Sequence, residues 1–331
     1  LIIYLLKKKY KISFFNEGIP FLKRLLFKII GIEIIEFKKK DISPTVSDYN
    51  LNYDFKYKNL NFSHLIKSQM KNSLNYIQDL KNRFDALNKF FELSNISFVI
   101  SNSNRSNGGM LIESADRKKI KSLMISHGTI AQGFNRYDEI YKKIIAEGIF
   151  SGKASFHAIQ SKITKNSLTT HKLKGKPIIT GNLVFAENKS HTKHKKFNFL
   201  YAVTNKPFPA MQLFGLEMYH EFFNNLKELE KFSKKNNFEI YINLHPGAKS
   251  SMQLLKEKFK TLYFTSGRIE KILKNASVTL SYSSTAIEDS IYFKVPVILF
   301  DTRSRYKHCE SETNPKKENK SIYYINSFQD L

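Results

Sequence analysis

The spacing of hydrophobic positions changes along the chain and indicates where a sheet begins. From about residue 96 onward, short apolar runs alternate with segments of helical periodicity. This alternation is typical of a parallel α/β sheet rather than a sandwich. In the first half the runs predict strands at 97–101, 121–126, 143–147 and 177–180, with a helix near 109–119 between the first two.

The same alternation starts again after a polar interval. Residues 187–196 (ENKSHTKHKK) hold no apolar side chain that could anchor them to a core, and they predict a linker. The second-half pattern then predicts helices near 211–235, 250–259, 268–274 and 285–293, and strands at 198–203, 238–244, 261–264, 277–281 and 295–300. We therefore expect an α/β protein of two Rossmann-type, doubly wound domains facing across a cleft, one over 1–186 and one over 197–331, the second truncated at its C-terminus.

The first 95 residues carry a weaker pattern. Residues 20–30 (PFLKRLLFKII) have a helical rhythm with Pro20 at a suitable first-turn position, and 32–37 predict a strand. The favoured interpretation of the basic segment 20–30 is a helix that covers a sheet, with its lysines in solvent. A helix lying on an anionic membrane is the alternative. Residues 63–93 keep helical spacing and predict one long helix or two joined helices.

Composition narrows the class of protein. The chain has 331 residues, of which 41% are hydrophobic and 25% charged, enough apolar material for packed cores. The single cysteine, Cys309, forms no internal disulfide and indicates a reducing compartment. Lysines interrupt every apolar run before it reaches the length of a membrane span. We expect a cytoplasmic protein whose closest relation to a membrane is a peripheral contact with the anionic inner membrane.

The net charge of +25 raises the question of an anionic partner. Only eight of the 54 basic residues are arginine, whereas surfaces that recognise phosphate use the guanidinium fork more often. A drift of composition toward lysine explains the charge more simply. A basic nucleic-acid-binding protein is an alternative that the charge alone supports, and we expect no nucleic-acid partner.

Chemically useful side chains follow the predicted strands. Asn205, His245 and the run from Ser283 come just past second-half strands, and Asn102 and His127 hold the same position in the first half. Open α/β sheets bind ligands beyond the carboxyl ends of their strands. If the two halves face each other, we expect all of these groups to line one cleft.

The strongest candidate is the run Ser283, Ser284, Thr285, with Glu288 three residues further on. Thr285 and Glu288 have the spacing of a capping box, which would start a helix at Thr285. A helix start offers unpaired N–H groups and the positive end of a dipole, so this run predicts a phosphate site. The alternative is that these residues only cap the helix.

Two histidines occupy strand ends. His245 precedes Pro246 and a glycine, and could donate a hydrogen bond to a phosphate or support a leaving group. His127, followed by Gly128, could act as a general base or bind an acceptor. For both histidines, a purely structural role in the loop is the alternative.

Several motifs are absent from the sequence. It holds no P-loop, no GxGxxG after a strand, no GxSxG elbow and no CxxC pair. It also lacks an Asp-x-Asp that would hold a divalent metal on a diphosphate. His191 and His194 lie among lysines that disfavour a bound cation, so we expect no metal and no cofactor.

The order of the motifs resembles that of bacterial GT-B glycosyltransferases of surface and capsular polysaccharide synthesis. It runs His-Gly-Thr at 127–129, Thr-Gly-Asn at 180–182, His-Pro at 245–246 and Ser-Ser-Thr at 283–285. Sialyltransferase-like, Kdo-transferase-like and CDP-glycerol glycerophosphotransferase-like enzymes are the most similar groups. The resemblance covers residues 95–310, and its specificity lies in the order and spacing of short motifs.

The resemblance implies a metal-independent enzyme that moves a sugar from a CMP- or CDP-linked donor onto a polysaccharide or lipid-linked acceptor. The domain over 1–186 would face the acceptor, and the domain over 197–331 would hold the nucleotide. Carried over by motif, the nucleotide- and phosphate-binding residues would be Asn205, His245, Pro246, Ser283, Ser284, Thr285 and Glu288. The acidic pair that supplies the base in many such enzymes has no match, which leaves the base open between His127, Glu113 and Asp116.

An enzyme of the UDP-N-acetylglucosamine 2-epimerase type is the runner-up interpretation. It would share the fold, but we expect it to place more carboxylates and an arginine around the sugar.

Overall fold

The computed structural model describes residues 7–15, 20–35, 54–104, 106–126, 128–150, 152–170, 175–181, 198–203, 215–304 and 307–331. Its internal contacts group the chain into two compact units. The first comprises Leu1–Met124 with Gly152–Phe156, and the second comprises Ile125–Ser151 with His157–Leu331. The predicted linker, 187–196, lies outside the described residues, so the predicted domain bounds stay predictions.

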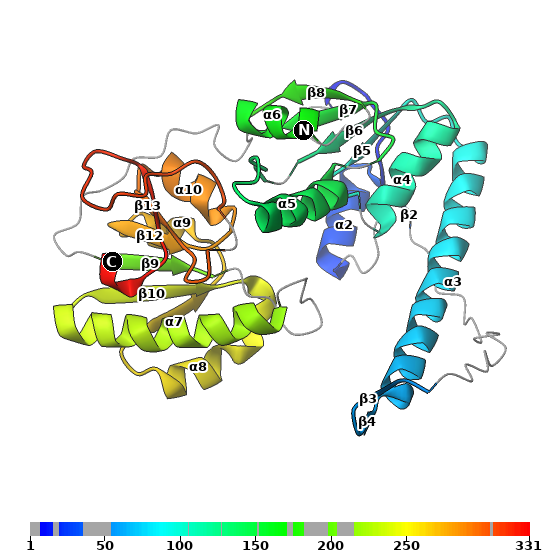
Figure 1. Cartoon of the computed structure of the whole chain (residues 1–331). Coiled ribbons are helices and arrows are strands. Elements are labelled where there is room, and N and C mark those ends of the chain that lie inside the picture. Colours follow the sequence, from blue (N-terminus) through cyan, green and yellow to red (C-terminus); the bar gives the residue numbers. More distant parts are fainter. Residues whose placement is uncertain are drawn as a thin grey trace. The chain divides into compact units, whose positions relative to one another are not determined.

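The second unit contains a six-stranded sheet with the order β11-β10-β9-β12-β13-β14 (Figure 1). Every neighbouring pair in it is parallel. The strands are β9 (Asn198–Ala202), β10 (Glu239–Leu244), β11 (Tyr263–Ser266), β12 (Val278–Ser281), β13 (Val297–Phe300) and β14 (Ile322–Ile325). Five of these strands were predicted. The sixth, β14, was missed because its sequence, IYYI, follows a long polar stretch.

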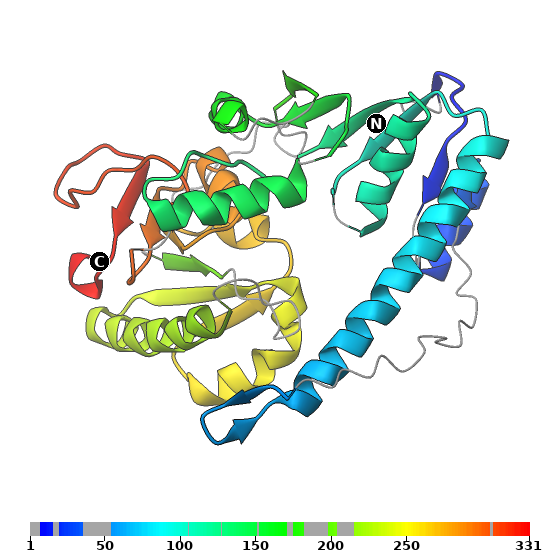
Figure 2. The same cartoon turned by 45° about the vertical axis from the view of Figure 1, so that its right-hand side comes forward.

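Helices cover both faces of this sheet. In Figures 1 and 2, α7 (Gly215–Asn236) and α8 (Met252–Lys258) lie on one face, and α9 (Glu270–Leu273) and α10 (Ala286–Tyr292) lie on the other. Two 3-10 helices complete the unit, η3 (Pro246–Ser251) and η4 (Phe328–Asp330). This layering is the doubly wound arrangement that the alternation of strands and helices predicts.

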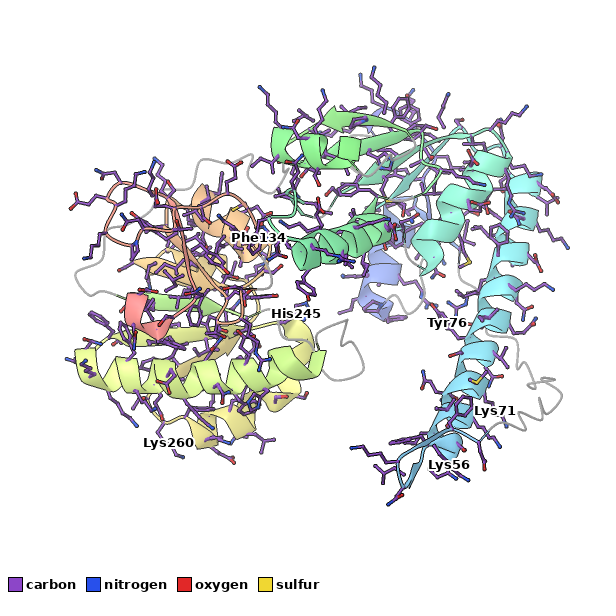
Figure 3. All side chains as sticks on the ribbon, in the orientation of Figure 1. Lys56, Lys71, Tyr76, Phe134, His245 and Lys260 are labelled. Atoms are coloured by element: carbon purple, nitrogen blue, oxygen red, sulfur yellow. The ribbon has the colours of Figure 1, made fainter. Side chains whose placement is uncertain are left out.

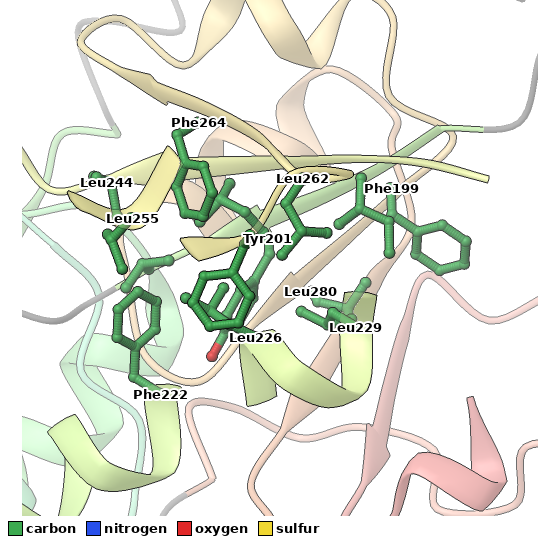
Figure 4. Close-up of a cluster of buried hydrophobic side chains, with 14 of the residues drawn as sticks. Phe199, Tyr201, Phe222, Leu226, Leu229, Leu244, Leu255, Leu262, Phe264 and Leu280 are labelled. Atoms are coloured by element: carbon green, nitrogen blue, oxygen red, sulfur yellow. The ribbon is translucent and has the colours of Figure 1, made fainter. Parts of the chain in front are cut away.

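Strand β9 shows why the sheet needs both layers, since all five of its residues are buried. Phe199 and Tyr201 pack into the core beneath α7 and α8, together with Leu226 of α7 (Figure 4). Leu200 and Ala202 point to the opposite face and pack with α9 and α10. Successive side chains of a strand alternate between faces, so an apolar run of this length is stable only between two helical layers.

The other sheet has four strands in the order β5-β6-β7-β8. They are β5 (Phe98–Ser101), β6 (Lys121–Ile125), β7 (Phe156–Ile159) and β8 (Lys176–Ile179), and β5 pairs with β6 in parallel. The helices that follow them are α4 (Ser106–Arg117), α5 (Arg136–Ile149) and α6 (Lys162–Thr170). The division between the compact units passes through β6 and β7.

One predicted strand is wrong. Residues 143–147 belong to the middle of helix α5, and the next strand of the sheet is β7. Asn135 caps α5 by accepting a hydrogen bond from Asp138 N (2.9 Å), and the apolar run KIIAE continues the helix from there. Periodicity does not distinguish a buried helix segment from a strand over so few residues. A histidine in the middle of β7, His157, hides the apolar character of that strand, although the residue is buried against Phe150.

The N-terminal part of the first unit holds β1 (Ser13–Phe15), α2 (Phe21–Ile29), β2 (Glu33–Ile35), the hairpin β3 (Lys56–Tyr57) and β4 (Leu60–Asn61), and α3 (Ser63–Leu93). The predicted helices at 20–30 and 63–93 are confirmed, the second as a single helix, whereas β1 and the hairpin were not predicted. The C-terminal end of α3 packs with α4, β5 and β6 through Leu87, Phe91 and Met124. Among the described residues, no helix combines the length and the apolar character that crossing a membrane requires.

The core of the second unit is tested by replacing Leu280, a fully buried residue of β12. Leu280→Ala removes apolar contacts and leaves a cavity, so we expect the free energy of unfolding to fall by about 2–5 kcal/mol. Leu254→Ala, on the exposed side of α8, is the control and should change it by less than about 0.5 kcal/mol. Urea denaturation followed by circular dichroism measures both. Equal losses for the two variants would contradict the described packing.

Candidate functional site

The order of strands in the six-stranded sheet reverses at β9. From β9 the chain proceeds outward to β10 and β11 on one side, and then returns to β12, β13 and β14 on the other. Ala202 of β9 consequently pairs with Asn243 of β10 and with Ser281 of β12. Such a switch point leaves a crevice beyond the carboxyl ends of the strands, where open α/β sheets bind their ligands. The residues that follow β9, β10 and β12 are therefore the candidates for a binding site.

Hydrogen bonds hold the carboxyl edge of these three strands together. Val203 N donates to Asn243 O (3.1 Å), and Ser281 Oγ donates to Ala202 O (3.1 Å). Thr265 Oγ1, at the end of β11, donates to Asn243 Oδ1 (3.1 Å). These bonds fix the ends of neighbouring strands relative to one another, and the side chains that follow the strands start from these ends.

His245 stands directly after β10 on this edge and is exposed (Figure 3). Its carbonyl accepts a hydrogen bond from Ala248 N (2.8 Å), which turns the chain into η3, where Pro246 is the first residue. Asn205, predicted at the same edge after β9, lies outside the described residues. The structure therefore brings His245 to the edge that also carries the segment after β12.

The segment after β12 starts α10 in a different way from the prediction. Thr285 is the N-cap residue, but its side chain makes no capping hydrogen bond and its backbone is helical (φ −61°, ψ −14°). A capping side chain needs an extended backbone at the cap. Ser284 takes this role instead, because its Oγ accepts a hydrogen bond from Ala286 N (3.2 Å). The predicted capping box is therefore wrong, while Ser283 and Ser284 stand half-buried at the helix start.

Glu288 contacts a distant segment, which its spacing from Thr285 did not indicate. Its Oε1 accepts a hydrogen bond from Thr129 N (3.1 Å) and lies 3.6 Å from His308 Nε2. A Cβ placed on Gly128 would lie 3.2 Å from Thr285 Cγ2, so the segment 128–129 lies tightly against the start of α10. All of these residues belong to the second compact unit.

His127 itself lies outside the described residues. Its neighbours Gly128 and Thr129 contact Thr285 and Glu288, so the structure brings two of the sequence motifs together.

A buried ion pair that the sequence analysis did not single out supports this arrangement. Lys142 and Asp138 of α5 are both buried and lie 3.0 Å apart. Lys142 Nζ also donates to Gln132 O and to Lys307 O, both at 2.6 Å. These bonds connect α5 to the loop that carries His308 beside Glu288. The only sign of this ion pair in the sequence is the spacing of four residues between Asp138 and Lys142 on one helix.

Burial dominates the electrostatics of this pair. It raises the pKa of Asp138 and lowers the pKa of Lys142, and the attraction between the two charges opposes both shifts.

Glu113, a candidate base, lies on α4 in the first compact unit. Its Oε1 accepts hydrogen bonds from Arg117 Nε and Lys153 Nζ, both at 3.1 Å. Partial burial raises the pKa of Glu113, but the bonds from the two cations outweigh burial and bring it below its ordinary value. Asp116, the other acidic candidate, lies 3.6 Å from the same lysine. A carboxylate held in this way is a weak proton acceptor.

Metal ligands do not gather in the part of the chain that the structure describes, where no three His, Cys, Asp or Glu side chains could jointly hold an ion. The expectation that the protein uses no metal and no cofactor stays a prediction.

No protein-family model matches the sequence, and no curated protein matches it. Among solved structures, the chain is similar to a putative UDP-N-acetylglucosamine 2-epimerase from Listeria monocytogenes, with 9% identity, a TM-score of 0.52, and 91% of this chain and 74% of that chain covered. A UDP co-structure of MnaA from S. aureus aligns at 12% identity and a TM-score of 0.46, over 68% of this chain and 62% of that one. The chain thus spans less than two thirds of the length of the S. aureus protein. The calicheamicin glycosyltransferase CalG4 aligns at 9% identity and a TM-score of 0.47, over 89% and 74%.

The similarity to the Listeria structure, at such low identity, concerns the fold. Together with the two sheets and their parallel pairings, it confirms the predicted class, an α/β protein with a GT-B-like fold. The GT-B fold is the class to which the structure assigns this chain.

Cys309 offers a test of the packing around Glu288. Burial, with the nearby Glu288 carboxylate as the second cause, raises the pKa of the thiol to about 11. Because the thiolate is the reactive form, the native protein should react with a thiol reagent at pH 8 roughly a hundredfold more slowly than the unfolded chain. The chain has one cysteine, so the absorbance of released thionitrobenzoate measures this rate directly.

Glu288→Gln provides the comparison, since it removes the carboxylate and keeps the shape. We expect the native rate to rise only in part, because burial remains. A native rate equal to that of the unfolded chain would contradict the described environment of Cys309.

Proposed function

We propose that this chain is a metal-independent glycosyltransferase of bacterial surface or capsular polysaccharide synthesis. It transfers a sugar from a nucleotide-activated donor, CMP- or CDP-linked, to a polysaccharide or lipid-linked acceptor. The observation that carries the proposal is the convergence of His245, Ser283 and Ser284 on the carboxyl edge of the sheet, at the point where its strand order reverses. This is the place where a doubly wound sheet can hold a nucleotide.

In this proposal the segment after β12 binds the donor phosphates. The hydroxyls of Ser283, Ser284 and Thr285 can each donate a hydrogen bond to a phosphate oxygen, and Ser284 Oγ can do so while it still accepts from Ala286 N. Asn205 and Pro246 complete the nucleotide site, as the sequence resemblance implies. His245, exposed two strands away on the same edge, donates a hydrogen bond or a proton to the departing nucleotide.

The geometry changes the part that Glu288 plays. One oxygen of its carboxylate accepts from Thr129 N, and the other is buried. Glu288 is accordingly a positioning residue in the proposal, which holds the segment after His127 against the start of α10. A direct contact between Glu288 and the nucleotide stays a prediction.

His127 is the base that the proposal favours. A neutral imidazole accepts a proton near neutral pH, whereas Glu113 is held ionised by two cations and its pKa lies below the ordinary value. His127 is joined through Gly128 and Thr129 to the segment that binds the phosphates. The acceptor hydroxyl would lose its proton to His127 while the bond between sugar and phosphate breaks.

His245→Ala tests the role of the exposed histidine. A positioned acid or hydrogen-bond donor contributes on the order of a hundredfold to ten-thousandfold in rate, so turnover should fall by that factor with an unchanged fold. Transfer from a radiolabelled nucleotide sugar to a polysaccharide acceptor, with circular dichroism for the fold, gives both readouts. His64→Ala is the control, because His64 is an exposed histidine on α3 outside the proposed site. Normal transfer by a folded His245→Ala protein would leave the histidine with a structural role.

The serines are expected to act on binding rather than on turnover. Ser284→Ala removes one hydroxyl among several donors, so the Michaelis constant for the donor should rise more than the turnover number falls.

A nucleotide sugar 2-epimerase is the second candidate function, and the similarity to the Listeria structure is the observation that favours it. A thermal-shift panel with CMP, CDP, UDP and GDP at equal concentrations separates the two, because the nucleotide that binds the folded state most tightly raises the melting temperature most. We expect CMP or CDP to give the largest shift. A shift with UDP alone, together with conversion of UDP-N-acetylglucosamine in the absence of any acceptor, would replace the transferase with the epimerase.

A further inference from the structure

Helix α2 carries an apolar face that the described part of the chain leaves uncovered. Phe21, Leu22 and Ile29 are 76%, 77% and 73% exposed, and Leu25 and Leu26 are 46% and 53% exposed. No residue of the helix is buried. Single exposed leucines are ordinary on protein surfaces, but so many in one short helix mark an interaction surface.

The helix is attached to the first unit by its opposite side. Phe27 is its half-buried residue, and the Phe27 ring lies edge-on to Phe14 of β1, with 5.1 Å between the ring centres. At about 100° per residue, Phe27 lies roughly 160° around the helix axis from the centre of the exposed apolar face. The chain then turns at Gly31 (φ 77°) and is fixed by Ile32, which is 4% exposed. The apolar face therefore points away from the strands that hold α2.

This segment of the first unit is also strongly basic. Within described residues 7–15 and 20–35 there are seven basic side chains and one acidic, Glu33. Lys23, Arg24 and Lys28 flank the apolar face of α2 itself. The other four, Lys7, Lys8, Lys9 and Lys11, precede β1 and are exposed. An apolar helix face bordered by cations fits the interface of an anionic bilayer, where charged headgroups lie above the hydrocarbon chains.

We propose that α2 docks this protein on an anionic lipid bilayer, with its apolar face below the headgroups and its basic side chains among the lipid phosphates. A nucleic acid would complement the charges but not the apolar face. A helix of nine residues is about 13 Å long, less than half of the hydrocarbon thickness of a bilayer, so α2 lies in the interface and does not span it. The proposal does not depend on the transferase activity, although a lipid-linked acceptor would be found at the same surface.

The test measures binding of the full chain to vesicles by flotation. We expect binding to vesicles of phosphatidylcholine with about 30% phosphatidylglycerol and at least tenfold weaker binding to phosphatidylcholine alone, since each basic residue near an anionic surface adds roughly fivefold.

The decisive variant is Leu22→Ser/Leu25→Ser/Ile29→Ser, which keeps every charge and removes three anchoring side chains. We expect its partition onto anionic vesicles to fall at least tenfold. The matched control is Leu65→Ser/Ile77→Ser on α3, which removes two apolar side chains that are 66% and 59% exposed, and it should bind as the parent chain does. Circular dichroism confirms that each variant is folded.

Three results would overturn the proposal. The first is unchanged binding of the folded α2 variant, which would mean that net charge alone attracts the protein to anionic vesicles. The second is equal loss of binding in the α3 control, and the third is no binding of the parent chain to anionic vesicles.

Discussion

Burial of the six-stranded sheet on both faces is the constraint on which the candidate site depends. Strand β9 offers side chains to two cores at once, Phe199 and Tyr201 to one and Leu200 and Ala202 to the other. Both layers of helices are needed to cover it, and a chain that builds two layers must place strands on both sides of its first strand. The reversal at β9 is thus a consequence of covering the sheet, and it opens the carboxyl edge where His245 and Ser283 stand.

Polar contacts then determine what lies against that edge. Glu288 accepts from Thr129 N, and the buried pair of Lys142 and Asp138 connects α5 to the loop carrying His308. Removing a charged group from water is costly unless it is paired and hydrogen-bonded, so these contacts hold their partners in defined positions. This network keeps the segment that follows His127 at the start of α10, so two parts of the proposed transferase site lie next to each other.

The wrong predictions concern short segments whose local pattern does not determine the structure. Residues 143–147 were expected as a strand and form part of α5, while β7 was missed because His157 lies within it. A run of five mostly apolar residues fits both the helical and the strand periodicity, and only the surrounding structure decides between a helix and a strand. Local pattern was also insufficient at the start of α10, where the spacing of Thr285 and Glu288 suggested a capping box. The helical backbone of Thr285 prevents this, and Ser284 performs the capping.

The sequence by itself determined the α/β class, five of the six strands of the larger sheet, the long helix 63–93, and the position of His245 and of the serine run after strands. These features follow from local periodicity and from the residue types at strand ends. Only the tertiary structure decided that β9 is the switch point, that Glu288 binds Thr129, and that Lys142 and Asp138 form a buried pair. Each of these depends on which distant segments meet, and the free energy that selects those contacts comes from burying apolar surface between elements rather than from the preferences of single residues.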